Sequence, residues 1–119
     1  MLLRYTGRRS GRRIELPVGR HTFDGNLAGF SNSRWRLNFR GGHDAELVVG
    51  GTTKPVRGEL VEDLAAVTEA YARAIDEVGW KAAQRRLGIR INVHRAPTRS
   101  ELERAIRSSG LSIVRFIER

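Results

Sequence analysis

Residues 45–60 read AELVVGGTTKPVRGEL, and this stretch decides the fold. Apolar residues dominate positions 45–49, and Gly50-Gly51 then supplies a tight turn, because glycine tolerates the positive φ angles that two-residue hairpins need. Residues 52–60 return with β-branched side chains that favour a strand. The stretch predicts a hairpin, and a hairpin of this length favours a fold built on an antiparallel sheet.

Strand patterns recur on both sides of this hairpin. Pro17 places one of them at a sheet edge or a bulge, because proline cannot donate a hydrogen bond to a strand ladder. Asp24-Gly25 is a second hairpin turn signal, and Ile89 to Val93 qualifies as a strand by alternation alone. Besides the hairpin, we expect strands at residues 2–6, 13–18, 26–31, 89–93 and 111–117.

Helical patterns lie between these strands. After Glu62 the apolar residues recur at spacings of three and four, which predicts an amphipathic helix that Gly79 ends. The capping box at 98–101 opens another helix that Gly110 closes. The expected helices span residues 33–38, with Ser33 as the cap, 62–78, 80–87, stopped by Gly88, and 98–109.

Together these patterns predict one α+β domain over residues 1–119. A chain of this length buries roughly two-thirds of its unfolded surface, which suits a single core. Strands joined by hairpins run antiparallel, and a sheet of six or seven short strands usually removes its edges by closing into a small barrel. We therefore expect a six- to seven-stranded antiparallel β-barrel with flanking helices.

The composition excludes several classes of protein. The sequence contains no cysteine, so disulfides, thiolate metal sites and cysteine nucleophiles are ruled out. The three histidines, His21, His43 and His94, are isolated, and we expect no metal site. Residues 1–3 are the longest uncharged stretch near the start, far short of the ~20 apolar residues of a membrane span. We expect a cytoplasmic protein without a membrane span.

The charge is strongly basic and unevenly distributed. Lysine and arginine number 22 against 13 acidic residues, which gives a formal charge of +9. Residues 1–20 carry +5 of this and residues 79–119 carry +7, whereas residues 59–78 carry −5. Such a field favours a polyanionic partner, whether nucleic acid, acidic lipid or a phosphate-bearing ligand. Of the 22 basic residues 20 are arginine, a bias that a GC-rich genome also produces.

The most distinctive segment is TGRRSGRR at residues 6–13, between two expected strands. Its two glycines permit backbone conformations in which amide N–H groups converge on an anion. Its arginines add bidentate hydrogen bonds to phosphate or carboxylate groups. The segment is a candidate phosphate cradle, and the alternative reading of the bare pattern is a solvated hairpin turn.

The order of residues in two segments resembles a known family. Residues 2–11 read LLRYTGRRSG and are followed by Pro17, and residues 31–40 begin at Ser31 and end in WRLNFR. Both segments resemble the signatures of the deazaflavin-dependent nitroreductases, which bind coenzyme F-420 in a split β-barrel. The resemblance implies a six- to seven-stranded antiparallel split β-barrel. It also implies a cofactor whose phosphodiester and polyglutamate tail suit a cradle of glycine and arginine.

The resemblance further implies two groups of cofactor-binding residues. The residues expected near the phosphate are Arg8, Arg9, Ser10, Gly11 and Arg13. Those expected near the deazaflavin ring and the substrate are Pro17, Ser31, Trp35 and Asn38, with Ser31 as the candidate contact to substrate or ring. No other catalytic residue is assigned, because the cofactor itself carries the hydride chemistry. The implied partners are a small-molecule redox substrate and a second copy of the chain in a homodimer.

The chain departs from the family pattern at three places. The usual helical segment before the first strand is missing, so we expect part of the substrate pocket to be missing as well. The loop between Ser31 and Trp35 is short, and no tyrosine-rich stretch follows Tyr71. Cofactor binding is therefore better supported than nitroreduction.

Three other functions are compatible with the sequence. An FMN-binding protein would use the same phosphate cradle, and a member that has lost its cofactor would serve as a scaffold. The third, a basic nucleic-acid-binding protein, is less favoured. The sequence has no recognition-helix or zinc motif and no strand on which aromatic side chains alternate for base stacking.

Overall fold

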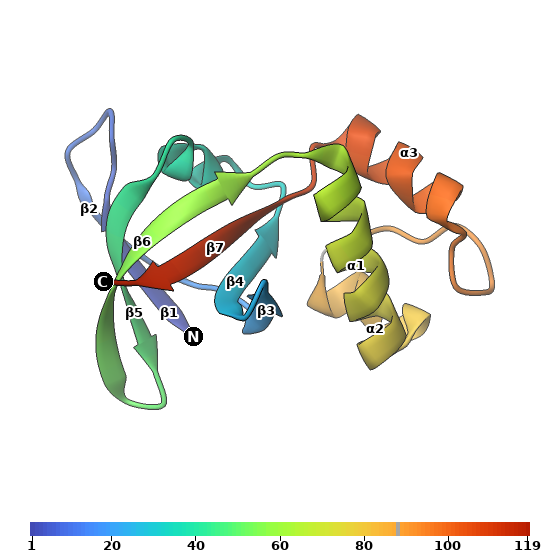
Figure 1. Cartoon of the computed structure of the whole chain (residues 1–119), viewed down its shortest axis with the longest axis horizontal. Coiled ribbons are helices and arrows are strands. Elements are labelled where there is room, and N and C mark those ends of the chain that lie inside the picture. Colours follow the sequence, from blue (N-terminus) through green and yellow to red (C-terminus); the bar gives the residue numbers. More distant parts are fainter. Residues whose placement is uncertain (88) are drawn as a thin grey trace.

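The computed structural model describes residues 1–87 and 89–119, so the helix stop predicted at Gly88 lies outside the described residues. Seven strands form one antiparallel sheet (Figure 1). They are β1 Leu2–Thr6, β2 Arg13–Pro17, β3 His21–Phe23, β4 Asn26–Ser31, β5 His43–Val49, β6 Thr52–Val61 and β7 Ser112–Glu118. The helices are the 3-10 helix η1 Arg34–Phe39 and the α-helices α1 Leu64–Val78, α2 Trp80–Arg86 and α3 Arg99–Ser109.

The sheet is open, which corrects the predicted barrel. Its strand order is β2-β1-β5-β6-β7-β4-β3, and within the described residues no ladder joins the edge strands β2 and β3. A closing ladder needs aligned N–H donors on both edges, but β3 has only three residues and β2 ends on Pro17, which has no donor. The edge position predicted for Pro17 is confirmed.

The open sheet is nevertheless strongly curled. Only residues 18–20 connect β2 to β3, so the Cα atoms of Pro17 and His21 lie at most about 15 Å apart. The edge strands of a flat sheet with seven strands would lie about 29 Å apart. The sheet must therefore wrap round on itself, and its concave face encloses apolar side chains.

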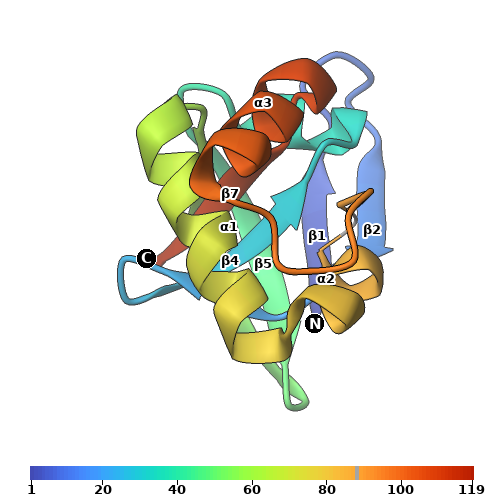
Figure 2. The ribbon, with the colours of Figure 1, turned by 90° about the vertical axis from the view of Figure 1, so that its right-hand side faces the viewer.

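Two apolar cores lie on opposite faces of this sheet. The buried residues of the concave core are Leu3, Tyr5, Phe39, Ala45, Leu47, Val56, Val114 and Phe116. The second core joins Ala28 of β4 and Ile113 of β7 to α1, α2 and α3. Ile113 and Val114 enter different cores because successive side chains of a strand point to opposite faces. Figure 2 shows α1 and α3 in front of β4 and β7, with α2 below them.

Local signals predicted most element boundaries correctly. Gly50 and Gly51 adopt φ angles of 56° and 80°, which confirms the central hairpin turn. The predicted capping box of α3 is present, and Asp63 caps α1 by accepting from the backbone N–H of Ala66 at 2.9 Å. Ser33 precedes η1, but its side chain makes no capping hydrogen bond. None of the helices that the structure describes is long and apolar enough to cross a membrane.

The strand predicted at residues 89–93 is wrong. These residues form an irregular segment, in which Ile89 is buried and Ile91 half-buried against the helices. The backbone N–H of Ile91 donates to the side-chain Oε1 of Gln84 at 3.4 Å instead of to a neighbouring strand. The alternating apolar side chains anchor this connecting segment to the helical core. The prediction was wrong because a half-buried strand shows the same alternation.

Candidate functional site

The β1–β2 hairpin loop is fixed to η1 by one residue, Arg8. Its backbone N–H donates to Asn38 Oδ1 at 3.0 Å. Its guanidinium donates to the carbonyl oxygens of Arg40 at 2.8 Å and Gly42 at 2.6 Å. The two segments that the sequence singled out, residues 6–13 and 31–40, therefore lie side by side.

Most amides of the hairpin loop are already used within the protein. Gly7 N–H donates to the Arg12 carbonyl at 2.8 Å, and Gly11 N–H donates to the Gly7 carbonyl at 3.0 Å. Arg12 N–H donates to Ser10 Oγ at 3.2 Å. Only the amides of Arg9 and Ser10 have no partner among the described residues. The loop thus offers two amides to an anion, fewer than the glycine pattern suggested.

The side chain of Ser10 folds back over the loop. Its Oγ lies 2.6 Å from the position that a Cβ on Gly7 would occupy, so a larger residue at position 7 would displace this hydroxyl. Because this oxygen also accepts from the Arg12 amide, the hydroxyl is committed to the shape of the turn. Ser10 therefore supports the cradle from within.

The arginines of the loop differ in their freedom. Arg8 is the clamp to η1, and Arg13 Nη2 lies 2.7 Å from Glu46 Oε1 on β5. Arg9 and Arg12 are exposed, and neither guanidinium has a hydrogen-bond or ion-pair partner in the part of the chain described. Arg9 and Arg12 are consequently the two loop side chains available to bind a phosphate. The segment at residues 6–13 that the sequence singled out includes Arg12, whereas the cofactor-binding residues implied by the family resemblance did not.

The ring group of candidate residues is only partly assembled. Asn38 Nδ2 donates to the Trp35 carbonyl at 2.9 Å, which ties these two residues to each other and, through Oδ1, to Arg8. The half-buried ring of Trp35 packs over Gly29 of β4 and makes an edge contact with Phe39, with 6.0 Å between ring centroids. Trp35 is therefore a wall of the concave core as well as a candidate ring contact.

Ser31 and Pro17 lie at the margins of this arrangement. Ser31 Oγ accepts from the Ser33 backbone N–H at 2.9 Å, at the entry to η1. Pro17 pairs with Leu2 at the end of β2 away from the loop, four residues beyond Arg13 and so about 13 Å along the strand. The structure brings Arg8, Asn38 and Trp35 together but leaves Pro17 apart from the loop arginines.

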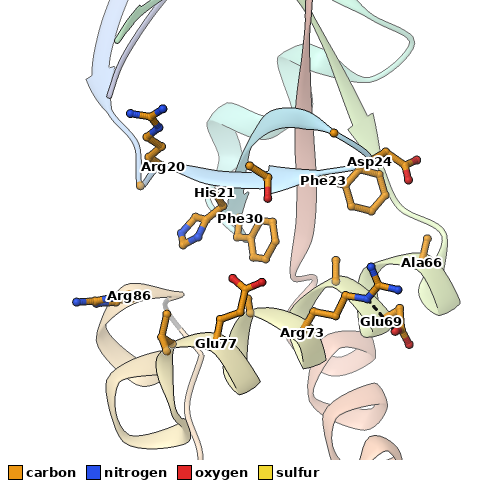
Figure 3. A pocket seen from close by; sticks show the side chains of 16 residues that line it. Arg20, His21, Phe23, Asp24, Phe30, Ala66, Glu69, Arg73, Glu77 and Arg86 are labelled. Carbon is orange, nitrogen blue, oxygen red and sulfur yellow. Dashed lines mark hydrogen bonds and ion pairs between the residues drawn. The ribbon is translucent and has the colours of Figure 1, made fainter. Parts of the chain in front are cut away.

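A groove of about 930 Å³ lies elsewhere, between β3 and α1, and sequence reasoning missed it (Figure 3). The residues of the preceding connection and the β3–β4 turn form one wall, and one face of α1 forms the other. On α1 the small side chains of Ala66, Ala70 and Ala74 face the groove. None of the cofactor-binding residues predicted from the sequence lines it.

The groove contains a half-buried histidine against an aromatic ring. His21 stacks on Phe30 with 4.8 Å between ring centroids and an interplanar angle of 25°. Burial lowers the pKa of His21 below its ordinary value, since burial disfavours the charged imidazolium. A backbone hydrogen bond to Arg86 and the charge of Glu77 oppose this shift, whereas the charge of Arg86 adds to it. The environment of His21 therefore favours the neutral imidazole.

No protein-family model and no curated protein matches the chain. The resemblance of residues 2–11 and 31–40 to deazaflavin-dependent enzymes therefore remains a hypothesis that rests on those residues alone. The groove carried no recognisable motif. Its only signal in the sequence was the run of alanines at spacings of four along one face of α1, and this pattern also fits ordinary helix packing.

Proposed function

We propose that this chain binds the deazaflavin coenzyme F-420 against the β1–β2 loop and η1, and that it transfers hydride between this cofactor and a small organic molecule. The observation that carries the proposal is the clamp between Arg8 and Asn38. It joins two segments that resemble the same family separately, although 30 residues separate the two bonded residues.

The charged and polar groups around this clamp suit a phosphate ester. The guanidinium groups of Arg9 and Arg12 are exposed on the loop, and the amides of Arg9 and Ser10 have no partner in the described residues. Charge-assisted hydrogen bonds of this kind replace the water that a phosphate loses on binding. The guanidinium of Arg8 donates to the carbonyl oxygens of Arg40 and Gly42, so its positive charge partly offsets these two carbonyl dipoles next to the proposed phosphate site.

The protein's own contribution is positional. F-420 supplies the hydride-carrying ring when it is bound, and the fixed loop would hold its phosphate. The half-buried indole of Trp35 would limit the water beside the ring, and its orientation is set by Gly29 and Phe39. In this proposal Arg13 is a positioning residue that ties β2 to β5 through Glu46. The homodimer expected from the resemblance is part of the same proposal.

Titration of the protein with F-420, followed by the absorbance and fluorescence of the cofactor, tests the proposal. We expect saturable binding at micromolar protein. FMN is titrated in parallel, because the same loop arginines suit its phosphate. If only FMN saturates the protein, the cofactor is a flavin and not F-420. If neither binds, the proposal is wrong and the alternative of a cofactor-free scaffold is favoured. Sedimentation velocity with and without cofactor measures the dimer.

A further inference from the structure

The groove between β3 and α1 lies on the helical side of the sheet, away from the residues proposed to hold a cofactor. We propose that it is a second binding site, and that it takes a planar aromatic molecule carrying one carboxylate. Its volume of about 930 Å³ falls within the range of small-molecule pockets.

One wall of the groove offers a fixed aromatic surface. The ring of His21 stacks on Phe30, and Phe30 in turn packs on the buried Tyr71 of α1 with 4.8 Å between ring centroids. This series of rings runs from the groove into the helix-side core, so the outer rings are held in place from behind. Phe23 adds a further half-buried ring from β3. Flat aromatic ligands bind such surfaces by offset stacking.

Two exposed arginines flank the end of the groove where His21 lies, and both side chains extend outward from it (Figure 3). Arg20 and Arg86 are exposed and line the groove, and neither guanidinium has an ion-pair partner among the described residues. An unpaired guanidinium favours a carboxylate, which it binds in a bidentate geometry. The carboxylate of the ligand is therefore expected at this end, where rotation of either exposed side chain would bring a guanidinium to it. The ligand ring is expected toward His21, because His21 and Tyr71 already pack on Phe30.

The acidic side chains of the groove differ in whether an arginine pairs with them. Glu69 lies 3.1 Å from Arg73 and 2.6 Å from Arg99, and Asp24 lies 3.9 Å from Arg115, so both are compensated by charges of the protein. Glu77 has no such partner in the described chain, and Figure 3 shows it extending from α1 toward His21 and Phe30. Glu77 would weaken the binding of an anion. Removing its charge should therefore strengthen binding, whereas removing the charge of a groove arginine should weaken it.

The sheet separates this groove from the proposed cofactor site. Gly29 of β4 faces Trp35 on the concave side, and the next residue, Phe30, faces the groove. Consecutive residues of a strand point to opposite faces, so a ligand in the groove cannot contact Trp35 through the sheet. The inference thus stands whether or not the chain binds F-420.

The experiment compares three probes that share one ring system, namely 2-naphthoate, 2-naphthalenemethanol and 2-naphthylmethylamine. Each is titrated into the isotopically labelled full chain, and amide chemical shifts are followed by NMR. We expect 2-naphthoate to shift amides of residues 19–25 and of α1, to bind with a dissociation constant of about 0.1–1 mM, and to bind more tightly than the other two probes.

Three variants separate the proposal from non-specific binding. Arg86→Ala is expected to weaken 2-naphthoate about fivefold, and Glu77→Gln to tighten it about twofold, because each changes one charge beside the carboxylate. Arg104→Ala removes an exposed arginine of α3 outside the groove and should leave the dissociation constant unchanged. The proposal is overturned if the amine binds as tightly as the acid, if the shifts fall in the β1–β2 loop, or if Arg86→Ala and Arg104→Ala behave alike.

Discussion

The backbone N–H of Arg8 donates to Asn38 Oδ1 over 3.0 Å, and the same asparagine donates through Nδ2 to the Trp35 carbonyl. One amide side chain thereby holds the β1–β2 loop, η1 and the carbonyl of a candidate ring residue in a fixed arrangement. Among the described residues of the loop and of η1, no other side chain both accepts from the Arg8 N–H and donates to the Trp35 carbonyl.

The variant Asn38→Ala is expected to lower the free energy of unfolding by about 1 kcal/mol, because it loses one hydrogen bond between the loop and η1 and one within η1. Urea denaturation measures this change. The amide of Arg8 should also exchange faster with deuterated solvent in the variant. Asn92→Ala serves as the control, since Asn92 is exposed and its side chain makes no hydrogen bond in the described structure. Equal losses in the two variants would refute the clamp.

Removal of the Arg9 side chain tests the proposed phosphate site directly. Arg9→Ala is expected to weaken F-420 binding by about 1.5–3 kcal/mol, the usual scale for a hydrogen bond to a charged group. Arg12→Ala should have a similar effect, because both guanidinium groups are exposed on the same loop. Arg104→Ala, on α3, is the matched control for lost positive charge. An unchanged dissociation constant in both loop variants would show that the cofactor phosphate lies elsewhere.

The contact of Phe39 with Gly58 gives a prediction about stability. Phe39 is fully buried, and its ring occupies the space where a Cβ on Gly58 would lie. Gly58→Ala should therefore destabilise the protein by about 1–3 kcal/mol through overpacking. In the double variant with Phe39→Leu, the loss should be smaller than the sum of the two single losses, because the smaller side chain makes room.

Gly29→Ala is the matched control for this steric effect. Gly29 also lies in the sheet beneath an aromatic ring, but a Cβ there would lie 3.5 Å from Trp35, at ordinary contact distance. We expect the midpoint of thermal unfolding to fall much less in Gly29→Ala than in Gly58→Ala. Similar midpoints for the two variants would contradict the close approach of Phe39 to β6.

The N-terminus of α3 predicts how stability depends on acid pH. The ion pair with Arg95, together with the backbone N–H of Thr98, lowers the pKa of Glu101 from 4.5 to about 2. Because the folded state holds this carboxylate charged, its contribution to stability is complete above pH 4.5 and is lost as the pH falls toward 2. The urea midpoint of Glu101→Gln should accordingly fall less than that of the native chain over this range.

Arg95→Ala provides the internal check on this acid dependence. It removes the largest cause of the lowered Glu101 pKa and should reduce the same acid loss. The double variant with Arg95→Ala and Glu101→Gln should then show the same acid dependence of the urea midpoint as Glu101→Gln alone. If Glu101→Gln keeps the full acid dependence of the native protein, other carboxylates are responsible for it.

Elements with local signals could be predicted from the sequence, whereas their partners could not. Gly50-Gly51 and the Thr98–Glu101 capping box fix their own turn and helix end, because the required φ angles and hydrogen bonds involve residues a few positions apart. Residues 89–93 failed for the converse reason. Their alternation indicates which side chains are buried, but it does not indicate whether the segment itself is a strand or an irregular stretch packed against helices.

The candidate site divides in the same way. The residue types of the loop and of η1 were evident from the sequence, and so was the likeness of their order to one family. The sequence did not show that Arg8, Ser10 and Arg13 make contacts within the protein. Each of these side chains could equally face solvent, and the neighbour that it contacts is brought close only by folding. The loop arginines open to a ligand are consequently Arg9 and Arg12.

The amino-acid order alone specified a basic, cysteine-free chain of antiparallel strands with inserted helices, because turn chemistry and periodicity are short-range properties. Only the tertiary structure decided that the sheet stays open between β2 and β3, since closure depends on free donors at two edges brought together by the curl. It also decided that a groove lies between β3 and α1, because the space between two elements depends on how both pack against a third.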